Sequence, residues 1–504
     1  MAASVLPHCP EDLLPLIVIE AGTSPEAFLE DQLTALLDSG AAERCFALGF
    51  ECEQYFLPGK PRVSLLALVA LQRGRDVPRI RLSLHPRTPD FETQVNAVLA
   101  RASDLEALAQ RWSVPWFTLG EPLALTPMVV PKPWGREVWY TGIEARGQAS
   151  VRVAGGRVPL HWLLAFAPTR LVAAQERRLI LLKRLEPWPD PLLGDLYFEM
   201  HEQKQEVYLV TRVDESLWPG GQGGIRLGFN PQKRARYADD QAFKADYLRA
   251  VQAYQAVRRE LDARLDRWRV EQGLGLDLPL RPEQYRAGME QIDPELKSRE
   301  QEQRSIMESY TAVRPVHRGD VVRVPPYTPH ALLHGVEVVE FQTPHYERKI
   351  LSFNQKVLTQ DHWDTVEALP KLSLDTPAQH PPRVWTLSPG QSLEQLADFS
   401  QFSVFRLRLK AGESFPLRRL QRFVPAADRP HYNLLMVLRG DPHYSHSPQT
   451  VLTPDEVHLL PSERGNLVLG CHHDTEVLLS IPGCRALEQA DSAPGLPEAG
   501  CAAY

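Results

Sequence analysis

A long series of short strand-like runs, interrupted once by a helical pattern, constrains the fold of this chain more than any other feature of its sequence. The runs fill residues 123–236, resume over residues 311–372 and appear again over residues 385–485. Glycine and proline break the runs, and the 44 prolines are spread along the whole chain. Because proline favours strand edges and turns, this pattern predicts a mainly β protein with many turn-bounded strands.

A helical insertion is expected within the first of these β-regions. The stretch "DDQAFKADYLRAVQAYQAVRRELDARLDRWRVEQG" carries apolar side chains at steps of three and four residues, namely Phe243, Tyr247, Val251, Tyr254, Leu261, Leu265 and Trp268. This spacing places them on one face of a long helix. We therefore expect residues 237–310 to be inserted in a domain that residues 123–236 and 311–372 build.

The first 122 residues have a different pattern. Strand-like runs such as "VSLLALVAL" and "RIRLSL" alternate with the helical patterns "SPEAFLEDQLTALLDSG" and "PDFETQVNAVLARASDLEALAQRW". Ser24 is the expected N-cap of the first helix, with Pro25 in its first turn. This segment is expected to form a separate α/β or α+β module, and it contains no chemical motif.

Composition excludes several classes of protein. The net charge is −7 and no long run of Lys or Arg occurs, so we do not expect nucleic acid as a partner. No signal peptide and no long apolar segment is present, which predicts a cytoplasmic protein without membrane association. The six cysteines form no CxxC pair and are expected to be reduced thiols. Residues 486–504 are small and polar, and are expected to be disordered.

The stretch "GDLYFEMHEQKQEVYLV" places acids, a histidine and a lysine in two strand-like runs. Side chains two residues apart share a face of a strand, so Glu199 and His201 point the same way. Phe198 and Met200 then point into the opposite packing layer. The polar "EQKQ" resembles a hairpin turn that would bring Glu206 across from the first pair. Such a cluster is either a solvated hairpin or a metal site.

A second stretch, "GDVVRVPPYTPHALLHGVEVVEFQTP", favours the metal site. Its glycine, proline and His330 have the spacing of the second signature of the cupin β-barrel. "GDLYFEMHEQKQE" supplies the first signature, with Glu199 in the first ligand position and one residue fewer than usual between Gly194 and that position. Together the motifs predict a site formed by Glu199, His201, Glu206 and His330. Imidazole and carboxylate ligands without thiolate suit Zn, Mn, Fe, Co or Ni. In the alternative interpretation, His330 is a barrel histidine with satisfied hydrogen bonds and Glu206 is an exposed hairpin acid.

The last β-region, residues 385–485, lacks the corresponding ligands. "EVHLLPSERGN" retains Pro461, but Asn466 stands where the second signature has its histidine. The histidines of "DPHYSHS" have odd spacing in a turn and are expected at the surface. We therefore expect a bicupin of two β-barrel or jelly-roll domains, in which one binds a metal and the other is structural.

Together with their surroundings, these motifs resemble the type I phosphomannose isomerases, a family of metal-dependent bicupin aldose–ketose isomerases. "PKPWGREVWYTG" resembles the family's opening Pro-Trp-Gly segment, "LYFEMH" its Leu-Ser-x-Gln-Val-His strand, and "KQEVYLV" its Lys-x-Glu. "VPPYTPHALLHGVEVVEFQTPHYERKI" resembles its Pro-x-Gly-x-x-His, its Glu-x-Gln and a later arginine. The resemblance extends from about residue 123 to residue 485 and leaves the N-terminal module outside.

The resemblance implies roles for individual residues. Glu199 stands where the family has a glutamine ligand, and the other three ligand positions match. Three further positions match groups around the sugar: Lys204, which would line the sugar site, Glu340, an acid beside it, and Arg348, near the reacting carbons. The resemblance also implies one divalent ion, with zinc preferred over Mn, Fe, Co or Ni, and a sugar or sugar phosphate as the small-molecule partner.

The sequence also departs from the family pattern. Glu199 in place of glutamine adds a negative charge, which should reduce the Lewis acidity of a bound ion. Tyr197 replaces the serine that helps to hold the sugar phosphate, which weakens the case for a phosphorylated substrate. Arg136 replaces a second glycine. The segment between the histidine and Lys-x-Glu is cut to three residues, which removes a loop that shapes the family's pocket.

The resemblance predicts an aldose–ketose isomerase that interconverts mannose 6-phosphate and fructose 6-phosphate or a related sugar. In simpler interpretations, Lys204 is an exposed turn lysine, Glu340 a strand-end acid and Arg348 its salt-bridge partner. One competing hypothesis is a non-catalytic bicupin that binds a sugar or small acid as a sensor or scaffold, with the N-terminal module as its partner module. Another keeps the metal but changes the reaction, to isomerisation of an unphosphorylated sugar or an oxygen-dependent reaction.

Overall fold

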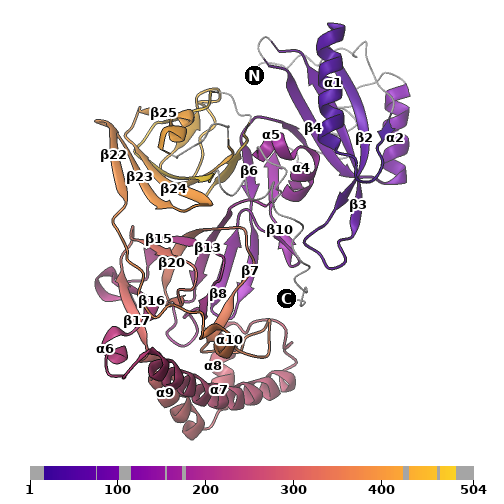
Figure 1. Ribbon diagram of the computed structural model, residues 1–504. Coiled ribbons are helices and arrows are strands. Elements are labelled where there is room, and N and C mark those ends of the chain that lie inside the picture. The colour runs from indigo at the N-terminus through magenta and orange to yellow at the C-terminus, as the bar shows by residue number, and fades with distance from the viewer. Residues whose placement is uncertain are drawn as a thin grey trace. The chain divides into compact units, whose positions relative to one another are not determined.

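The structure is a computed structural model that describes residues 16–74, 77–100, 115–153, 156–172, 178–423, 431–462 and 466–483. It divides into two compact units (Figure 1). Unit 1 comprises residues 1–128, 140–179 and 383–503, and unit 2 comprises residues 129–139 and 180–382. None of the described helices is both long enough and apolar enough to cross a membrane. The tail predicted to be disordered lies outside the described residues.

Two sheets form the body of unit 2. A six-stranded sheet has the order β18-β15-β20-β13-β8-β7, with β7 (Met128–Lys132), β8 (Gly135–Trp139), β13 (Leu181–Pro187), β15 (Glu206–Val213), β18 (Val321–Val324) and β20 (Val336–Gln342). A five-stranded sheet has the order β17-β16-β19-β14-β21, with β14 (Phe198–Met200), β16 (Gly223–Phe229), β17 (Thr311–Val316), β19 (His330–Leu332) and β21 (Lys349–Ser352). The chain is thus mainly β with several sheets, as predicted.

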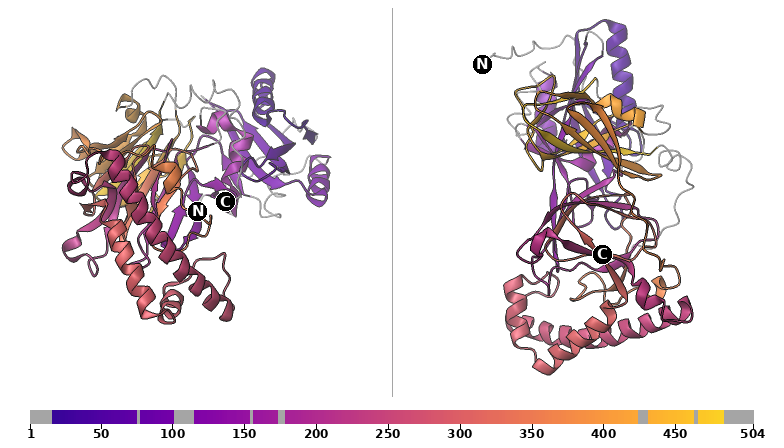
Figure 2. Two further views of the ribbon diagram at one scale, coloured as in Figure 1. Left: turned by 60° about the horizontal axis from the view of Figure 1, so that its bottom comes forward. Right: turned by 90° about the vertical axis from the view of Figure 1, so that its left-hand side faces the viewer.

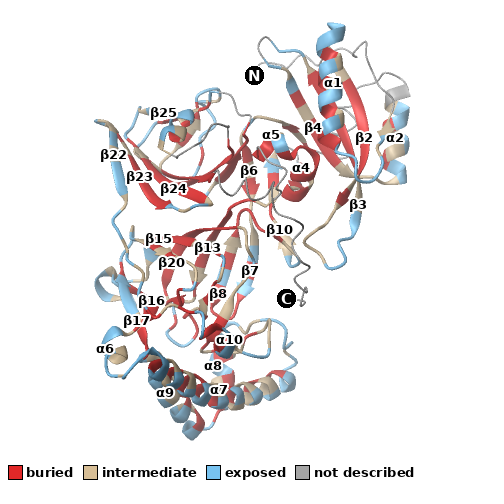
Figure 3. Cartoon of the chain, in the orientation of Figure 1, coloured by how far each residue is buried: buried red, intermediate tan, exposed pale blue. Residues whose placement is uncertain are grey.

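The two sheets of unit 2 enclose one apolar core. Alternating side chains of the six-stranded sheet enter it, among them Leu185, Tyr208, Val322 and Val338. The five-stranded sheet contributes Ile225, Leu227, Leu332 and Ile350. Because one face of each strand is buried in this core, the register of every strand is strongly specified. Figure 3 shows β13, β15 and β20 as largely buried strands.

The outer face of the five-stranded sheet packs against a long helix. Phe198, Met200 and Leu351 of the sheet form a core with Phe243 and Tyr247 of α7 (Asp240–Glu271). Asp239 caps α7 by accepting a hydrogen bond from the amide of Ala242. The predicted helix and its apolar face are confirmed, with Trp268 only half-buried. Shorter elements complete unit 2: η1 (Pro219–Gly221), α6 (Pro231–Arg234), α8 (Pro282–Glu290), α9 (Pro294–Glu308) and α10 (Thr365–Ala368).

Because α7 packs against the outer face of the five-stranded sheet, polar side chains can lie on the inner face. Figure 2 shows α7, α8 and α9 grouped at one end of unit 2. Since Phe198 and Met200 pack outward against α7, Glu199 between them points into the space between the two sheets. The alternation predicted from the sequence is therefore confirmed at this strand.

Unit 1 contains a nine-stranded sheet of order β12-β11-β6-β28-β26-β30-β24-β23-β22. Its strands are β6 (Leu123–Thr126), β11 (Ser150–Val153), β12 (Gly156–Pro159), β22 (Arg383–Ser388), β23 (Gln391–Asp398), β24 (Phe402–Leu409), β26 (Asn433–Arg439), β28 (Val457–Leu460) and β30 (Thr475–Pro482). It shares a core with a three-stranded sheet of β25 (Ser414–Pro416), β27 (Pro442–Tyr444) and β29 (Val468–Cys471). Smaller elements are β9 (Ile143–Glu144), β10 (Gly147–Gln148), α4 (Leu160–Phe166), α5 (Pro168–Val172) and η2 (Leu417–Phe423).

The N-terminal part of unit 1 is a five-stranded sheet covered by helices. Its strands are β1 (Ile17–Val18), β2 (Glu43–Glu53), β3 (Arg62–Gln72), β4 (Arg79–Pro86) and β5 (Trp116–Thr118). Helix α1 (Pro25–Ser39) begins with Ser24 as its N-cap and Pro25 at its first position, as predicted. Helix α2 (Pro89–Ala100) packs Phe91 against one face of the sheet. The rest of the second helical pattern lies outside the described residues.

Two strand pairings differ from those expected. Strands β14 and β15 do not form a hairpin, because β14 pairs with β19 and β21 whereas β15 pairs with β18 and β20. The polar turn between them instead carries the chain from one sheet to the other. Strand β6 pairs with β11 and β28 in the nine-stranded sheet, although its residues were expected in the metal-binding domain. The hydrophobic pattern specifies which face of a strand is buried but not which strand lies next to it.

The described cysteines Cys45, Cys52 and Cys471 are buried, and none of these three forms a disulfide. This agrees with the prediction of reduced thiols for these three. The other three cysteines lie outside the described residues.

Candidate metal centre

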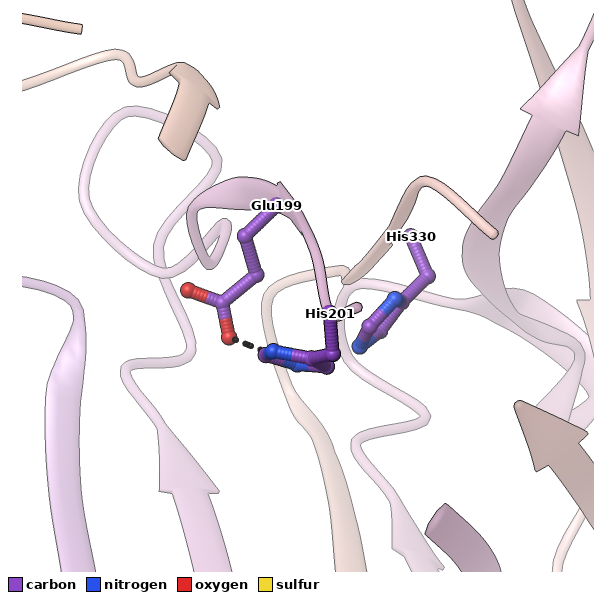
Figure 4. Close-up of side chains that lie close together, drawn as sticks. All are labelled: Glu199, His201 and His330. Atoms are coloured by element: carbon purple, nitrogen blue, oxygen red, sulfur yellow. Dashed lines mark ion pairs between the residues drawn. The ribbon is translucent and has the colours of Figure 1, made fainter. Parts of the chain in front are cut away.

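A cluster of one acid and two histidines lies on the inner face of the five-stranded sheet. Glu199 on β14 is the direct cross-strand partner of His330 on β19, so their side chains share one face. His201 follows two residues after Glu199 and points the same way. One ligand atom from each of the three residues lies within 4.8 Å of the others. Figure 4 shows the three side chains converging, with Oε1 of Glu199 3.7 Å from Nε2 of His201.

Backbone carbonyls orient both histidine rings. Nδ1 of His201 lies 2.8 Å from the carbonyl oxygen of Glu347, and Nδ1 of His330 lies 3.0 Å from that of Thr328. Because a carbonyl oxygen can only accept, each Nδ1 must carry the proton of its hydrogen bond. The neutral form of each ring then presents the lone pair of Nε2 to the centre. Metal-binding histidines are usually oriented by such an outer hydrogen bond.

Glu206 faces this cluster from the other sheet. It is the first residue of β15, and its carboxylate oxygens lie 3.4 Å from Nε2 of His201 and 3.0 Å from Nε2 of His330. Lys204 Nζ lies 2.9 Å from the same carboxylate, and the Tyr208 hydroxyl donates to it at 2.8 Å. All of these side chains are buried. The interpretation of Glu206 as an exposed acid and Lys204 as an exposed turn lysine is therefore wrong.

The electrostatics of the cluster favour a cation. Burial and the ammonium of Lys204 hold the pKa of His201 well below its usual range, so the ring is neutral. Burial alone would raise the pKa of Glu206, but Lys204 and the two histidines lower it well below its usual range. Burial opposes protonation of His330, yet the adjacent Glu206 carboxylate raises the pKa of that ring. A neutral Nε2 lone pair of His201 therefore faces two carboxylates, an arrangement that a cation would stabilise.

A second observation supports the fit of Glu199, His201 and His330 to a divalent ion. Oε2 of Glu199 and Nε2 of both His201 and His330 are buried without a hydrogen-bond partner among the described residues. Buried polar atoms are normally satisfied, and leaving one unpaired costs about 1–3 kcal/mol. Three such atoms pointing at one centre match the nitrogen and oxygen donor set that Zn and related ions prefer.

A row of polar side chains crosses the inner face of the six-stranded sheet. Trp139, Lys183, Glu340 and Tyr208 are successive cross-strand partners on β8, β13, β20 and β15. Lys183 Nζ lies 3.9 Å from Oε2 of Glu340, donates to Oε1 of Gln342 at 2.6 Å, and sits 4.6 Å from the centroid of the Trp139 ring. The interpretation of Glu340 as a strand-end acid is wrong, because this carboxyl is buried within the row.

Burial has the largest effect on the pKa of Glu340 in that row. It raises the pKa of Glu340 well above the ordinary range, and the nearby Glu206 adds to this effect while Lys183 opposes it.

Lys183 was not among the predicted site residues. The signal was present, since it is the one charged residue within the apolar run "LILLK". A lysine that points into the interior of a sheet requires polar partners, and these identify the row.

Arg348 is half-buried and does not pair with Glu340. It donates to the Thr359 hydroxyl at 2.6 Å, and its guanidinium carbon lies 4.8 Å from the centroid of the Tyr197 ring. Burial opposes its charge, but Glu199 and Tyr197 raise the pKa of Arg348. The simpler interpretation of Arg348 as the salt-bridge partner of Glu340 is wrong, since Lys183 is the cation beside that carboxyl. Arg348 thus belongs to the Glu199 side of the centre.

Hydrogen bonds from backbone amides hold the segments that carry the candidate ligands His201 and His330. Oε1 of Glu347 accepts hydrogen bonds from the amides of Glu202 at 2.6 Å and Gln203 at 2.7 Å. The amide of Tyr327 donates to the carbonyl oxygen of His201 at 2.6 Å. Tyr327 has φ 63°, a left-handed conformation that a tyrosine rarely adopts. It occupies the glycine position of the motif Pro-x-Gly-x-x-His.

The structure does not form a comparable site in the last β-region. His446 is exposed, and the ring of His443 stacks on that of His472 with centroids 4.4 Å apart. Asn466, at the predicted histidine position, accepts a hydrogen bond from Arg418 at 3.2 Å. Within the described part of the chain, no second group of three ligand-type side chains lies as close together as Glu199, His201 and His330.

No model of a protein family and no curated protein matches the sequence. Among solved structures, mannose 6-phosphate isomerase from Bacillus subtilis is 13% identical, with 71% of this chain and 99% of that chain covered and a TM-score of 0.46. A zinc-bound mannose 6-phosphate isomerase is 11% identical, with 72% and 99% covered and a TM-score of 0.49. A variant of phosphomannose isomerase from Salmonella typhimurium is 11% identical, with the same coverage and a TM-score of 0.48. These values do not assign the chain to a family.

Proposed function

We propose that unit 2 is a metal-dependent aldose–ketose isomerase that interconverts mannose 6-phosphate and fructose 6-phosphate or a related sugar. The observation that carries the proposal is the neutral, unpaired Nε2 of His201, which faces Glu199 and Glu206. Glu199, His201, Glu206 and His330 would hold the ion. When bound, the ion would polarise sugar oxygens as a Lewis acid.

The protein's own residues can carry the proton transfer. The Glu340 carboxylate would take the proton from C2 of the aldose. The C–H electron pair then forms the C1=C2 bond of a cis-enediol-type intermediate, while the carbonyl oxygen at C1 takes up the proton that the C2 hydroxyl releases. Glu340 returns its proton to C1, and the oxygen at C2 becomes the ketone oxygen. A carboxyl whose pKa is raised by burial is a suitable group for this exchange near neutral pH.

Cationic side chains can stabilise the charge that develops on the sugar oxygens. Lys183 lies beside Glu340, and Lys204 lies beside Glu206. Both ammonium groups are buried and held in place by hydrogen-bonding or ionic partners. Donors that are already oriented in a site of low dielectric stabilise developing negative charge strongly. Arg348, beside Glu199 and Tyr197, would add a third cation.

An isomerisation assay tests the proposal directly. Mannose and mannose 6-phosphate would each be incubated with protein loaded with Zn²⁺, Mn²⁺ or Co²⁺, and the ketose followed by NMR. We expect conversion that a chelator abolishes and the metal restores. His330→Ala should be inactive, whereas His446→Ala, which changes an exposed histidine of unit 1, should retain activity. Metal-loaded wild-type protein that converts neither sugar would contradict the proposal and favour a non-catalytic binding role.

A further inference from the structure

The cationic side chains around the candidate centre already have partners within the protein. Lys132 Nζ lies 3.3 Å from Oε1 of Glu137, and Lys204 Nζ lies 2.9 Å from Glu206. Both pairs are buried. Taking either lysine away would remove the ammonium that neutralises a buried carboxylate, which is unfavourable. Each of these lysines therefore neutralises a buried acid, which leaves neither of them as an uncompensated counter-ion for a phosphate dianion.

The other two cations also have contacts within the protein. Lys183 is held by Gln342 and Glu340 and lies over the Trp139 ring. Arg348 donates to Thr359 and lies over the Tyr197 ring, on the side of Glu199. The region thus combines four cationic side chains with four acidic side chains: Glu137, Glu199, Glu206 and Glu340.

A phosphate dianion is a poor ligand for such a balanced site. Phosphate recognition relies on several charge-assisted hydrogen bonds from cations that are free to turn toward it. Here the three lysines lie beside acidic side chains, and the carboxylates of Glu137 and Glu206 would repel a dianion in a region of low dielectric. A neutral sugar meets neither difficulty, since its hydroxyl groups can donate to the carboxylates and accept from the ammonium groups.

Tyr327 supplies an independent observation that points to a ligand. Its left-handed backbone is held on both sides, since its amide donates to the His201 carbonyl at 2.6 Å and its carbonyl accepts from the amide of Ser373 at 2.8 Å. Glycine would adopt this conformation without strain. The ring is nevertheless 40% exposed and so is not retained for core packing. Strain beside a candidate centre suggests a role for the side chain itself.

A second exposed tyrosine lies near the same histidine. Tyr346 is 47% exposed and stacks on Trp139, with ring centroids 5.8 Å apart. It directly precedes Glu347, whose carbonyl accepts the hydrogen bond from Nδ1 of His201. Exposed tyrosines combine an apolar face with a polar tip, and both properties suit the C–H and O–H groups of a sugar ring.

From the paired charges and the strained tyrosine, we propose that the substrate is an unphosphorylated, neutral aldose or ketose and that Tyr327 is a specificity-determining residue that contacts it. This inference rests on the proposed isomerase function and narrows its substrate class. It assigns the sugar's recognition to an aromatic contact beside His201 rather than to a phosphate site.

Equilibrium binding and kinetics on the metal-loaded full chain test the inference together. The probes are d-mannose, mannose 6-phosphate and inorganic phosphate. We expect d-mannose to bind and to have the higher kcat/KM, with no competition from inorganic phosphate. Tyr327→Gly should raise KM for d-mannose about fivefold with little change in kcat, and Tyr327→Phe should keep KM within about twofold.

A matched control separates backbone strain from sugar contact. Asp455 of unit 1 has φ 68°, so Asp455→Gly relieves the same type of conformation outside the candidate centre. Its KM should equal that of the wild type, whereas Tyr327→Gly should lose affinity while keeping or increasing its Tm. Preference for mannose 6-phosphate, competition by inorganic phosphate, or an unchanged KM in Tyr327→Gly would overturn the inference. Binding of d-mannose without conversion would support the inference on substrate class while overturning the isomerase.

Discussion

Glu199 lies directly opposite His330 in the five-stranded sheet of unit 2, although the long helical insertion separates them in sequence. This one register places both side chains on the inner face and, through the two-residue repeat, His201 beside them. A shift of the strand register by one residue would turn these side chains to the outer face of the sheet. It would also disrupt the apolar core around them. The candidate centre is therefore as well specified as the core of the sheets.

Glu199→Gln tests whether the Glu199 carboxylate is a metal ligand. The substitution removes one of two carboxylates that face the histidines, so affinity for a divalent cation should fall by roughly tenfold or more. Calorimetric titration with Zn²⁺ would measure it. Glu202→Gln, which changes an acid paired with Lys371 in the same turn, is the control and should keep wild-type affinity. Equal affinities in the two variants would remove Glu199 from the ligand set.

Glu347→Ala should weaken metal binding without removing a ligand. Its carboxylate holds the amides of Glu202 and Gln203, so its loss frees the turn that follows His201. We expect faster hydrogen exchange of those amides and an affinity reduced by about 10–100-fold. Glu347→Gln retains an accepting oxygen and should lie between the wild type and the alanine variant. A variant with free amides and unchanged affinity would show that this turn does not position His201.

Glu340→Gln should separate catalysis from metal binding. The amide keeps the size of the side chain and can still interact with Lys183, but it cannot accept and return a proton. Isomerisation should fall by about 10²–10⁴-fold with metal content unchanged. Steady-state kinetics and elemental analysis on the same preparation would measure both. Activity within a few-fold of the wild type would assign the proton transfer to another group.

His458 should make unit 1 sensitive to acid. Burial lowers the pKa of this histidine to about 4 in the folded protein, below its usual value near 6.5 in an unfolded chain. Above pH 6.5 the ring is neutral in both states, and between about pH 6.5 and 4 only the unfolded chain gains the proton. Stability should therefore fall across this window, by up to roughly 3 kcal/mol.

Denaturant unfolding at pH 7 and pH 4.5 measures this effect. His458→Gln retains an acceptor for the Tyr444 hydroxyl, which lies 3.0 Å from Nδ1 of His458, and cannot be protonated. Its stability should change less between the two pH values than that of the wild type. An identical acid dependence in both proteins would assign the effect to other groups.

The sequence predicted the candidate centre because its signals are local. The spacing of Glu199, His201 and His330 indicates that they lie on one face of the sheet. The apolar residues that alternate with them indicate that the opposite face is packed in a core. Lys183 was missed because its partners, Glu340 and Gln342, come from a strand far away in the sequence. A buried lysine within an apolar run was the available signal.

Strand partners could not be predicted in the same way. The expected hairpin around Glu206 and the expected place of β6 both failed, because periodicity carries no information on which edge a strand joins. The strained backbone of Tyr327 was equally hidden. It follows from hydrogen bonds to His201 and Ser373 that only the assembled fold provides.

Metal content tests the central claim most directly. Elemental analysis of purified wild-type protein, incubated with Zn²⁺ and desalted, would be compared with His330→Ala and with His446→Ala as the control. We predict about one ion per chain in the wild type and in His446→Ala, and its loss in His330→Ala with an unchanged circular dichroism spectrum. A wild-type protein that retains no divalent ion, or a His330→Ala variant that retains as much, would contradict the metal centre.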